Sequence, residues 1–136
     1  IHGVIPEFFR EERVEKIFTD CDKLTYTKSM AERKTLMEDD ADAFIIAPGG
    51  IGTLEEFYEV ITLKQLGRHS KALAMFNIGG YFDTLEKFMR EMSEKDFMAQ
   101  ACHGMYRYFT DADELLDYLE GYSPSQESWR KLKNTD

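Results

Sequence analysis

A short apolar run that ends in a glycine-rich turn constrains the fold of this chain more than any other feature of its sequence. Residues 43–47 read Ala-Phe-Ile-Ile-Ala, and Pro48-Gly49-Gly50 follow directly. A wholly apolar run of this length predicts a strand that is buried on both faces of a parallel sheet. Parallel strands are joined by crossover connections that are usually helices. Helices are therefore expected between the strands of this chain.

The rest of the sequence alternates between strand-like and helix-like segments. The predicted strands, which include the apolar run, cover residues 3–5, 23–28, 43–47, 71–77 and 105–109. The predicted helices cover residues 29–40, 53–66 and 83–94, with a last one from Asp111 or Asp113 to about Gly121. This alternation predicts an α/β fold, a Rossmann-like doubly wound parallel sheet with helices on both faces.

Residue spacing within the helical segments indicates how they begin and which side they bury. Ser29 is a favoured residue for the position that caps a helix start. On the helix predicted over 83–94, the side that faces the core is expected to carry Leu85, Phe88, Met89 and Met92. In sheets of this kind, ligands bind beyond the carboxyl ends of the strands.

Length and charge limit the kind of protein and the kind of partner. The 136 residues include 17 Lys and Arg against 26 Asp and Glu, so 17 − 26 gives a net charge of −9. A chain of this size predicts one domain, over residues 1–120, followed by a tail or terminal helix over 121–136. The acidic balance argues against nucleic-acid binding and against an anionic membrane surface. Any phosphate that the protein binds is therefore expected to be held by local groups.

The cysteines and the apolar segments predict a cytoplasmic protein. Cys21 and Cys102 occur without a CxxC pattern or a Cys/His cluster, so we expect neither a disulfide scaffold nor a metal site. The sequence contains no apolar run of about 18 residues and no signal-peptide pattern. His2, His69 and His103 are scattered, and we expect each to be a surface histidine or one satisfied within the fold.

The glycine-rich segment between the buried strand and the next helix predicts a phosphate site. Three glycines in the four positions 49–52 allow a tight turn and a close approach of the backbone to a ligand. The helix that follows offers unpaired N–H groups and the positive end of its dipole. The segment is neither a P-loop nor a dinucleotide fingerprint. The alternative is structural, because Thr53-x-x-Glu56 is also a capping box that starts a helix.

Two cations near the start of the helix over 29–40 form a second candidate. Arg33 and Lys34 oppose the dipole of the helix there, which favours a role in ligand binding. A solvated charged face, in which Arg33 pairs with Glu32 or Glu38, is the more ordinary explanation. From these residues alone both interpretations stay open.

Together, the two segments resemble the LOG (Lonely Guy) family of cytokinin-activating phosphoribohydrolases, often labelled lysine decarboxylase-like. The family combines an RKxxM motif with PGGxGTxxE, and this chain reads RKTLM over residues 33–37 and PGGIGTLEE over residues 48–56. Arg33 and Glu56 lie 56 − 33 = 23 positions apart, as the catalytic Arg and Glu do in the family. The likeness continues through residues 3–6, 61–71 and 77–83, so that it covers about residues 3–120.

The resemblance implies hydrolysis of the N-glycosidic bond of a nucleoside 5′-monophosphate, either AMP or a cytokinin riboside monophosphate. It implies a homodimer with Gln65 at the interface, a nucleotide as the partner, and no metal or organic cofactor. The implied catalytic residues are Arg33 and Glu56. The implied substrate-binding and phosphate-binding residues are Met30, Lys34, Gly49, Gly50, Ile51, Gly52 and Thr53.

The sequence also departs from the family pattern. Ala31 and Leu63 stand where several members have His and Trp. The strand, glycine-rich loop and helix that open a family member are not found ahead of residue 1, and the fold is expected to lack them. Two alternatives follow, a protein that binds a nucleotide or molybdenum cofactor without hydrolysing it, and an inactive, N-terminally truncated homologue.

Overall fold

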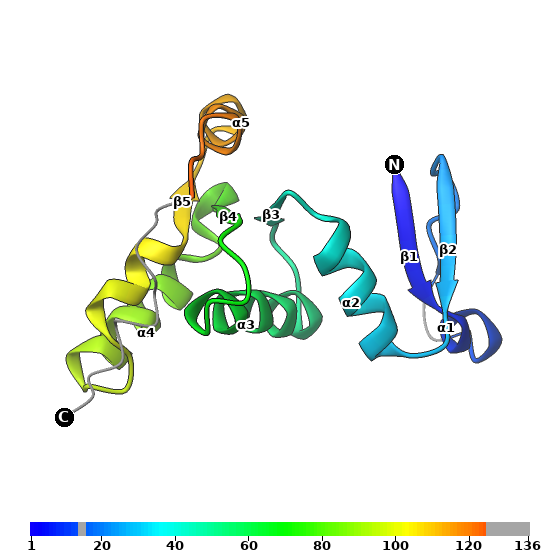
Figure 1. Cartoon of the computed structure of the whole chain (residues 1–136), viewed down its shortest axis with the longest axis horizontal. Coiled ribbons are helices and arrows are strands. Elements are labelled where there is room, and N and C mark those ends of the chain that lie inside the picture. The colour runs from blue at the N-terminus through cyan, green and yellow to red at the C-terminus, as the bar shows by residue number, and fades with distance from the viewer. Residues whose placement is uncertain (14–15, 125–136) are drawn as a thin grey trace. The chain divides into compact units, whose positions relative to one another are not determined.

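The computed structural model describes residues 1–13 and 16–124 and divides the chain into two compact units, residues 1–41 and residues 42–136 (Figure 1). The first unit contains β1 (His2–Pro6), α1 (Glu7–Glu11), β2 (Lys23–Thr27) and α2 (Met30–Asp40). The strands β1 and β2 pair in parallel, with Gly3 opposite Leu24. A side chain at Gly3 would meet the Leu24 side chain at 2.9 Å, so glycine allows the close approach.

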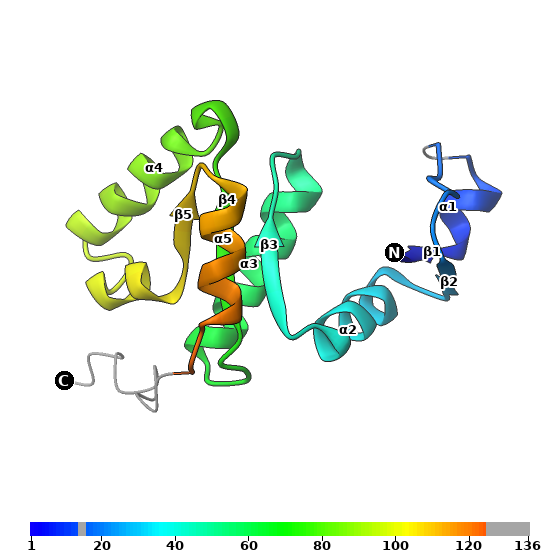
Figure 2. The same cartoon turned by 90° about the horizontal axis from the view of Figure 1, so that it is seen from above.

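The second unit contains three parallel strands in the order β3-β4-β5 (Figure 2). These strands are β3 (Ala43–Ile46), β4 (Ala72–Phe76) and β5 (Arg107–Phe109). The α-helices are α3 (Ile51–Gln65), α4 (Asp83–Glu94) and α5 (Ala112–Glu120), and the short 3-10 helices are η1 (Ile78–Gly80) and η2 (Gln100–Met105). Each strand is followed by a helix, as the alternation in the sequence predicts.

Helices cover both faces of this three-stranded sheet. Leu73 and Met75 of β4 point into a core that they form with α3, α4 and η2. Ala74, between them, points the other way into a smaller cluster with Phe109 and Leu115 of α5. Because successive side chains of a strand face opposite sides, the burial of all three residues confirms the α/β fold with parallel strands and helices on both faces. Strand pairing is divided between the two-stranded sheet of residues 1–41 and this sheet.

Two expectations about buried faces are wrong. Ile45 of β3 is 49% exposed, although its strand is predicted to be buried on both faces. The reason is that β3 is an edge strand of its sheet, whereas α5 packs on β4 and β5. On α4, Leu85, Met89 and Met92 contact the core as expected, but Phe88 is 53% exposed.

The boundaries of several elements also differ from the sequence expectation. The last strand begins at Arg107 and not at Met105, because residues 100–105 form η2. The predicted caps of α2 and α5 are confirmed: the Ser29 side chain accepts from the Glu32 N–H, and that of Asp111 accepts from Asp113 and Glu114. The terminal segment predicted over 121–136 lies, beyond residue 124, outside the described residues.

Candidate active site

The first turn of α2 holds Arg33 beside the strand β1. The Ser29 hydroxyl accepts from the Glu32 N–H at 3.1 Å, and the Glu32 carboxylate accepts from the Lys28 N–H at 2.7 Å. The first bond caps the helix start, and the second ties Glu32 to the residue before the cap. The Arg33 Nε donates to the Val4 carbonyl of β1 at 3.0 Å, so the guanidinium is anchored to a strand. Arg33 is half-buried, whereas Met30 is exposed at the helix start.

The glycine-rich loop leads directly from β3 into the first turn of α3. Gly50 caps the helix without a side-chain hydrogen bond, and the first helical bond runs from the Leu54 N–H to the Gly50 carbonyl at 3.3 Å. The amides of Ile51, Gly52 and Thr53 therefore precede the hydrogen-bonded ladder of the helix. Ile51 is 89% exposed. Amides at such a helix start can accept an anion without any basic side chain.

This geometry contradicts the capping-box interpretation of Thr53 and Glu56. Helix α3 begins at Ile51, two residues earlier than predicted, so Thr53 lies inside its first turn. The glycine at position 50 takes the capping position instead. Thr53 Oγ1 lies 2.1 Å from the point that a Cβ on Gly49 would occupy, so only glycine fits there. In contrast, a Cβ on Gly50 or Gly52 would meet nothing within 4 Å.

Glu56 follows these amides by one helical turn. Its position places it on the same side of α3 as Gly52 and Thr53, which precede it by four and three residues. The residue is half-buried, and its neighbour Phe57 is fully buried in the core. The structure therefore brings together the loop glycines, Thr53 and Glu56 within the second unit. Met30, Arg33 and Lys34 belong to the first unit.

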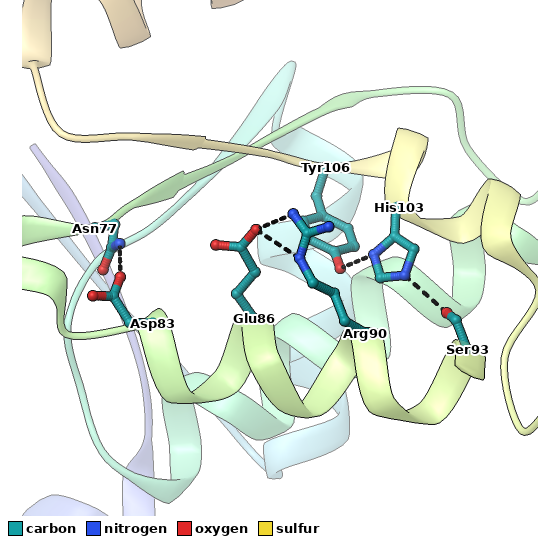
Figure 3. Close-up of polar contacts among 7 residues, drawn as sticks. All are labelled: Asn77, Asp83, Glu86, Arg90, Ser93, His103 and Tyr106. Carbon is teal, nitrogen blue, oxygen red and sulfur yellow. Dashed lines mark hydrogen bonds and ion pairs between the residues drawn. The ribbon is translucent and has the colours of Figure 1, made fainter. Parts of the chain in front are cut away.

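The loop after β4 contacts the glycine-rich loop, which the sequence expectation did not include. The Tyr81 hydroxyl donates to the Gly49 carbonyl at 2.5 Å. The sequence signal for this loop is Asn77-Ile78-Gly79-Gly80-Tyr81-Phe82-Asp83, which the family resemblance contains but to which it assigns no role. Asn77 and Asp83 hydrogen-bond to each other across the base of the loop (Figure 3).

The sequence expectation also missed a buried lysine at the other end of α3. Lys64 is 1% exposed, and its Nζ donates to the carbonyls of Lys71 and Met105, both at 2.8 Å, and to the Tyr122 hydroxyl at 3.2 Å. Burial lowers the pKa of Lys64 to about 8. The only sequence signal is a lysine within the otherwise largely apolar segment 60–66.

Each of the three histidines lies at the surface or has a hydrogen-bond partner within the fold, as predicted. His103 hydrogen-bonds through Nε2 to Ser93 Oγ at 2.8 Å and through Nδ1 to the Tyr106 hydroxyl at 3.2 Å (Figure 3). His69 Nε2 donates to the Val60 carbonyl at 2.8 Å, and burial lowers the pKa of His69. His2 Nε2 lies 2.8 Å from Thr25 Oγ1.

In residues 1–13 and 16–124, no group of three or more His, Cys, Asp and Glu side chains could hold a metal ion. Over the same residues, no helix combines the length and the apolar character needed to cross a bilayer.

Comparison with known proteins adds a family and several relatives. The family model described as "Possible lysine decarboxylase" matches residues 1–119. The probable cytokinin riboside 5′-monophosphate phosphoribohydrolase LOGL3 of Oryza sativa subsp. japonica is 37% identical over 122 residues, which are 90% of this chain and 57% of the relative. The cytokinin riboside 5′-monophosphate phosphoribohydrolase LOG4 of Arabidopsis thaliana is 42% identical over 99 residues, 73% of this chain and 46% of the relative.

A bacterial protein of the same name is similar to this chain to a comparable degree. The cytokinin riboside 5′-monophosphate phosphoribohydrolase of Mycobacterium marinum is 36% identical over 122 residues, 90% of this chain and 63% of the relative. The chain spans about half the length of the curated relatives that it matches. Since the family model covers most of the chain, including both motifs, this protein belongs to the possible lysine decarboxylase family, and it is similar to the LOG phosphoribohydrolases.

Proposed function

We propose that this protein hydrolyses the N-glycosidic bond of a nucleoside 5′-monophosphate, AMP or a cytokinin riboside monophosphate, to the free base and ribose 5-phosphate. The observation that carries the proposal is the family membership, joined to relatives in plants and a bacterium whose names state this activity. The chain carries RKTLM and PGGIGTLEE in the same order as the family pattern.

The proposed chemistry assigns the central role to Glu56. Cleavage of the bond between C1′ and the base develops positive charge on the ribose, so a nearby carboxylate stabilises the transition state more than the ground state. A water molecule adds its oxygen to C1′, and the departing base gains a proton. Glu56 can orient that water and accept its proton. The position of Glu56, one turn after the amides at the start of α3, supports this assignment.

The remaining proposed residues hold the substrate. The amides of Gly50, Ile51, Gly52 and Thr53 bind the 5′-phosphate, and Gly49 lets the loop close against Thr53. Arg33 contacts the substrate or assists the departing base, with Met30 and Lys34 beside it on α2. Binding energy from the phosphate positions the sugar, so a nucleoside without phosphate is expected to react poorly.

The family description raises decarboxylation, a reaction that commonly uses a lysine Schiff base. Lys64 is the buried lysine of the described chain, but its Nζ already donates to three acceptors. It lies 64 − 51 = 13 residues along α3 from Ile51, which is about 20 Å at the rise of a helix. This distance supports a reaction without a lysine-bound cofactor at the glycine-rich loop, and we propose that the protein requires neither cofactor nor metal.

Release of adenine from AMP by the purified protein, followed by liquid chromatography, tests the proposal. We expect Glu56→Gln to reduce kcat at least about 100-fold, because the carboxylate charge acts in the transition state. Glu55→Gln, which changes the neighbouring exposed carboxylate, is the matched control and is expected to retain activity. Arg33→Ala is expected to lose most of the activity, and Arg10→Ala to retain it.

Three results would contradict or redirect the proposal. A protein that binds AMP but releases no adenine would be a nucleotide-binding protein. Equal activity of Glu56→Gln and the parent would remove Glu56 from the mechanism. Equal rates on AMP and adenosine would exclude the phosphate as a source of positioning energy.

We further propose that the protein is a cytoplasmic homodimer with Gln65 and the apolar side of α3 at the interface. The support is the family resemblance and the two cysteines, Cys21 and Cys102, which are free thiols. Light scattering after size exclusion tests the dimer, and a monomer at micromolar concentration would contradict it.

A further inference from the structure

A side chain from the loop after β4 contacts the backbone of the glycine-rich loop. The Tyr81 hydroxyl donates to the Gly49 carbonyl at 2.5 Å, across 32 residues of sequence. The Tyr81 ring packs edge-on against Phe82, with ring centroids 5.1 Å apart. Phe82 is buried in the core, so the ring has a fixed support although it is itself 55% exposed.

The loop that carries Tyr81 is held from several directions. Asn77, which is buried, donates from Nδ2 to Asp83 at 2.7 Å (Figure 3). Its side-chain oxygen accepts from the Phe82 N–H at 2.6 Å. Its own N–H donates to the Phe109 carbonyl of β5 at 2.7 Å. Gly80 has a φ of +73°, and a side chain there would meet the Asp83 carboxylate at 2.6 Å. Tyr81 therefore projects from a fixed frame.

The contact determines the orientation of one peptide group. The carbonyl of Gly49 and the N–H of Gly50 belong to the same planar trans peptide and point in opposite directions. When Tyr81 holds the carbonyl, the Gly50 N–H is directed away from Tyr81. Gly50 caps α3, so its amide stands next to those of Ile51 and Gly52, and a Cβ on Gly50 would meet nothing within 4 Å. No side chain at either glycine restricts this peptide.

We propose that Tyr81 is a positioning residue that orients the Gly50 amide toward the 5′-phosphate of the substrate. This inference rests on the proposed function, because it assigns Tyr81 to the same phosphate site. Without the hydroxyl, the peptide between Gly49 and Gly50 is ordered only when the ligand binds. That ordering costs affinity for every ligand that carries the phosphate, and it leaves the chemical step unchanged.

The test compares Tyr81→Phe with the parent protein in three measurements. These are the Kd for ribose 5-phosphate by calorimetry, KM and kcat for AMP, and the thermal unfolding midpoint. Tyr81→Phe keeps the ring on Phe82 and removes only the hydroxyl.

We expect Kd and KM to rise about tenfold, the cost of one disordered charge-assisted hydrogen bond. We expect kcat to stay within about twofold, because the lost interaction binds the ground state and the transition state equally. Tyr118→Phe, in the α5 cluster, is the matched control and should behave like the parent.

The route through Gly50 is tested by a double-mutant cycle. Gly50→Pro removes the N–H that Tyr81 is proposed to orient, at a residue whose φ of −88° is close to that of proline. If Tyr81 acts through this amide, Tyr81→Phe should weaken ribose 5-phosphate binding about tenfold in the parent background and little in Gly50→Pro. If Gly50→Pro fails to fold, the comparison of Tyr81→Phe with the parent still tests whether Tyr81 contributes to phosphate binding.

Each outcome separates this inference from the proposed function. A parent that hydrolyses AMP, with an unchanged Kd in Tyr81→Phe, would overturn the inference alone. A lower unfolding midpoint and a smaller fraction of binding-competent protein at unchanged Kd would mean a structural role only, and would also overturn it. In a third outcome the parent binds ribose 5-phosphate but releases no adenine from AMP, and Tyr81→Phe binds ribose 5-phosphate more weakly than the parent. That result would reject the hydrolysis and retain the role of Tyr81.

Discussion

Lys64 is a buried cation that the fold satisfies with neutral oxygens. Its ammonium group has three N–H donors, and three acceptors surround it, the carbonyls of Lys71 and Met105 and the Tyr122 hydroxyl. The Tyr122 ring lies 5.2 Å from Nζ, which adds a cation–π contact. The side chain therefore ties the end of α3 to the segments that lead into β4 and β5.

Lys64 is expected to make the stability of the protein depend on pH above neutrality. Burial lowers its pKa from 10.5 to about 8 in the folded chain. Between these values the unfolded chain binds more protons than the folded one, so the free energy of unfolding contains a term that rises with pH. Lys64→Met removes this term. We expect the parent to gain stability relative to Lys64→Met between about pH 8 and 10.5, measured by urea unfolding.

The same variant has an expected effect at pH 7. Met fills much of the volume of the lysine side chain but leaves the acceptors without their donor, so Lys64→Met should cost about 2 kcal/mol. Lys87→Met, an exposed lysine on α4, is the control and should change stability by less than about 0.5 kcal/mol. A stability difference between parent and Lys64→Met that does not change from pH 8 to 10.5 would contradict the prediction. It would show that the acceptors keep Lys64 protonated over this range, so that its pKa is not lowered by folding.

At the scale of the element, the glycine-rich loop contains glycines that are present for different reasons. Gly49 is required by packing, because Thr53 Oγ1 occupies the space of a side chain. Gly52 has open space on the side where its Cβ would lie and sits in the first turn of α3, where alanine is a better helix former. Open space around an exposed amide is what a ligand needs to approach the backbone.

These two glycines are expected to respond differently to alanine. Gly49→Ala should lower the free energy of unfolding by about 1–3 kcal/mol, the usual cost of overpacking. Gly52→Ala should leave stability unchanged or slightly higher and should instead weaken the binding of ribose 5-phosphate. Chemical unfolding and calorimetry measure the two effects. Equal destabilisation by both variants would contradict the distinction.

Helix starts illustrate why a local pattern is sometimes sufficient and sometimes not. Ser29-x-x-Glu32 and Thr53-x-x-Glu56 are the same capping pattern in the sequence. The first caps α2, as its hydrogen bonds show. The second does not cap α3, because the preceding glycines let the chain enter the helix two residues earlier. Whether the pattern caps a helix therefore depends on the backbone that precedes it, and the four residues of the pattern do not specify that backbone.

At the scale of the whole molecule, the two units differ in how much they bury. Among the described residues of 1–41, only Pro6 and Thr27 are buried. Residues 42–124 contain the large core around β4, with Leu73 and Met75 fully enclosed. Segments with few buried apolar contacts open at a lower free energy than a core strand.

Hydrogen exchange should therefore separate the units. We expect the amides of β4 to exchange at least about 100-fold more slowly than those of β1 and β2, because β4 exchanges only through global unfolding. Exchange followed by mass spectrometry on the intact chain measures this difference. Equal protection of β1, β2 and β4 would mean that the two units unfold as one cooperative structure.

The sequence by itself determined the features that depend on residues close together in the chain. The alternation of strands and helices, the caps at Ser29 and Asp111 and the glycine-rich turn at residues 48–53 are local, because each follows from the spacing or chemistry of a few neighbours. The two motifs also indicated the family, which the family model confirmed. The catalytic assignment of Arg33 and Glu56 stays a prediction.

Only the tertiary structure decided what depends on contacts between distant segments. Ile45 is exposed because β3 is an edge strand, Lys64 is buried because Met105 and Tyr122 supply acceptors, and Tyr81 reaches Gly49 across 32 residues. Periodicity shows which residues share a side of an element, but not what covers that side. Burial and long-range hydrogen bonds are properties of packing, and packing is set by the whole arrangement of elements.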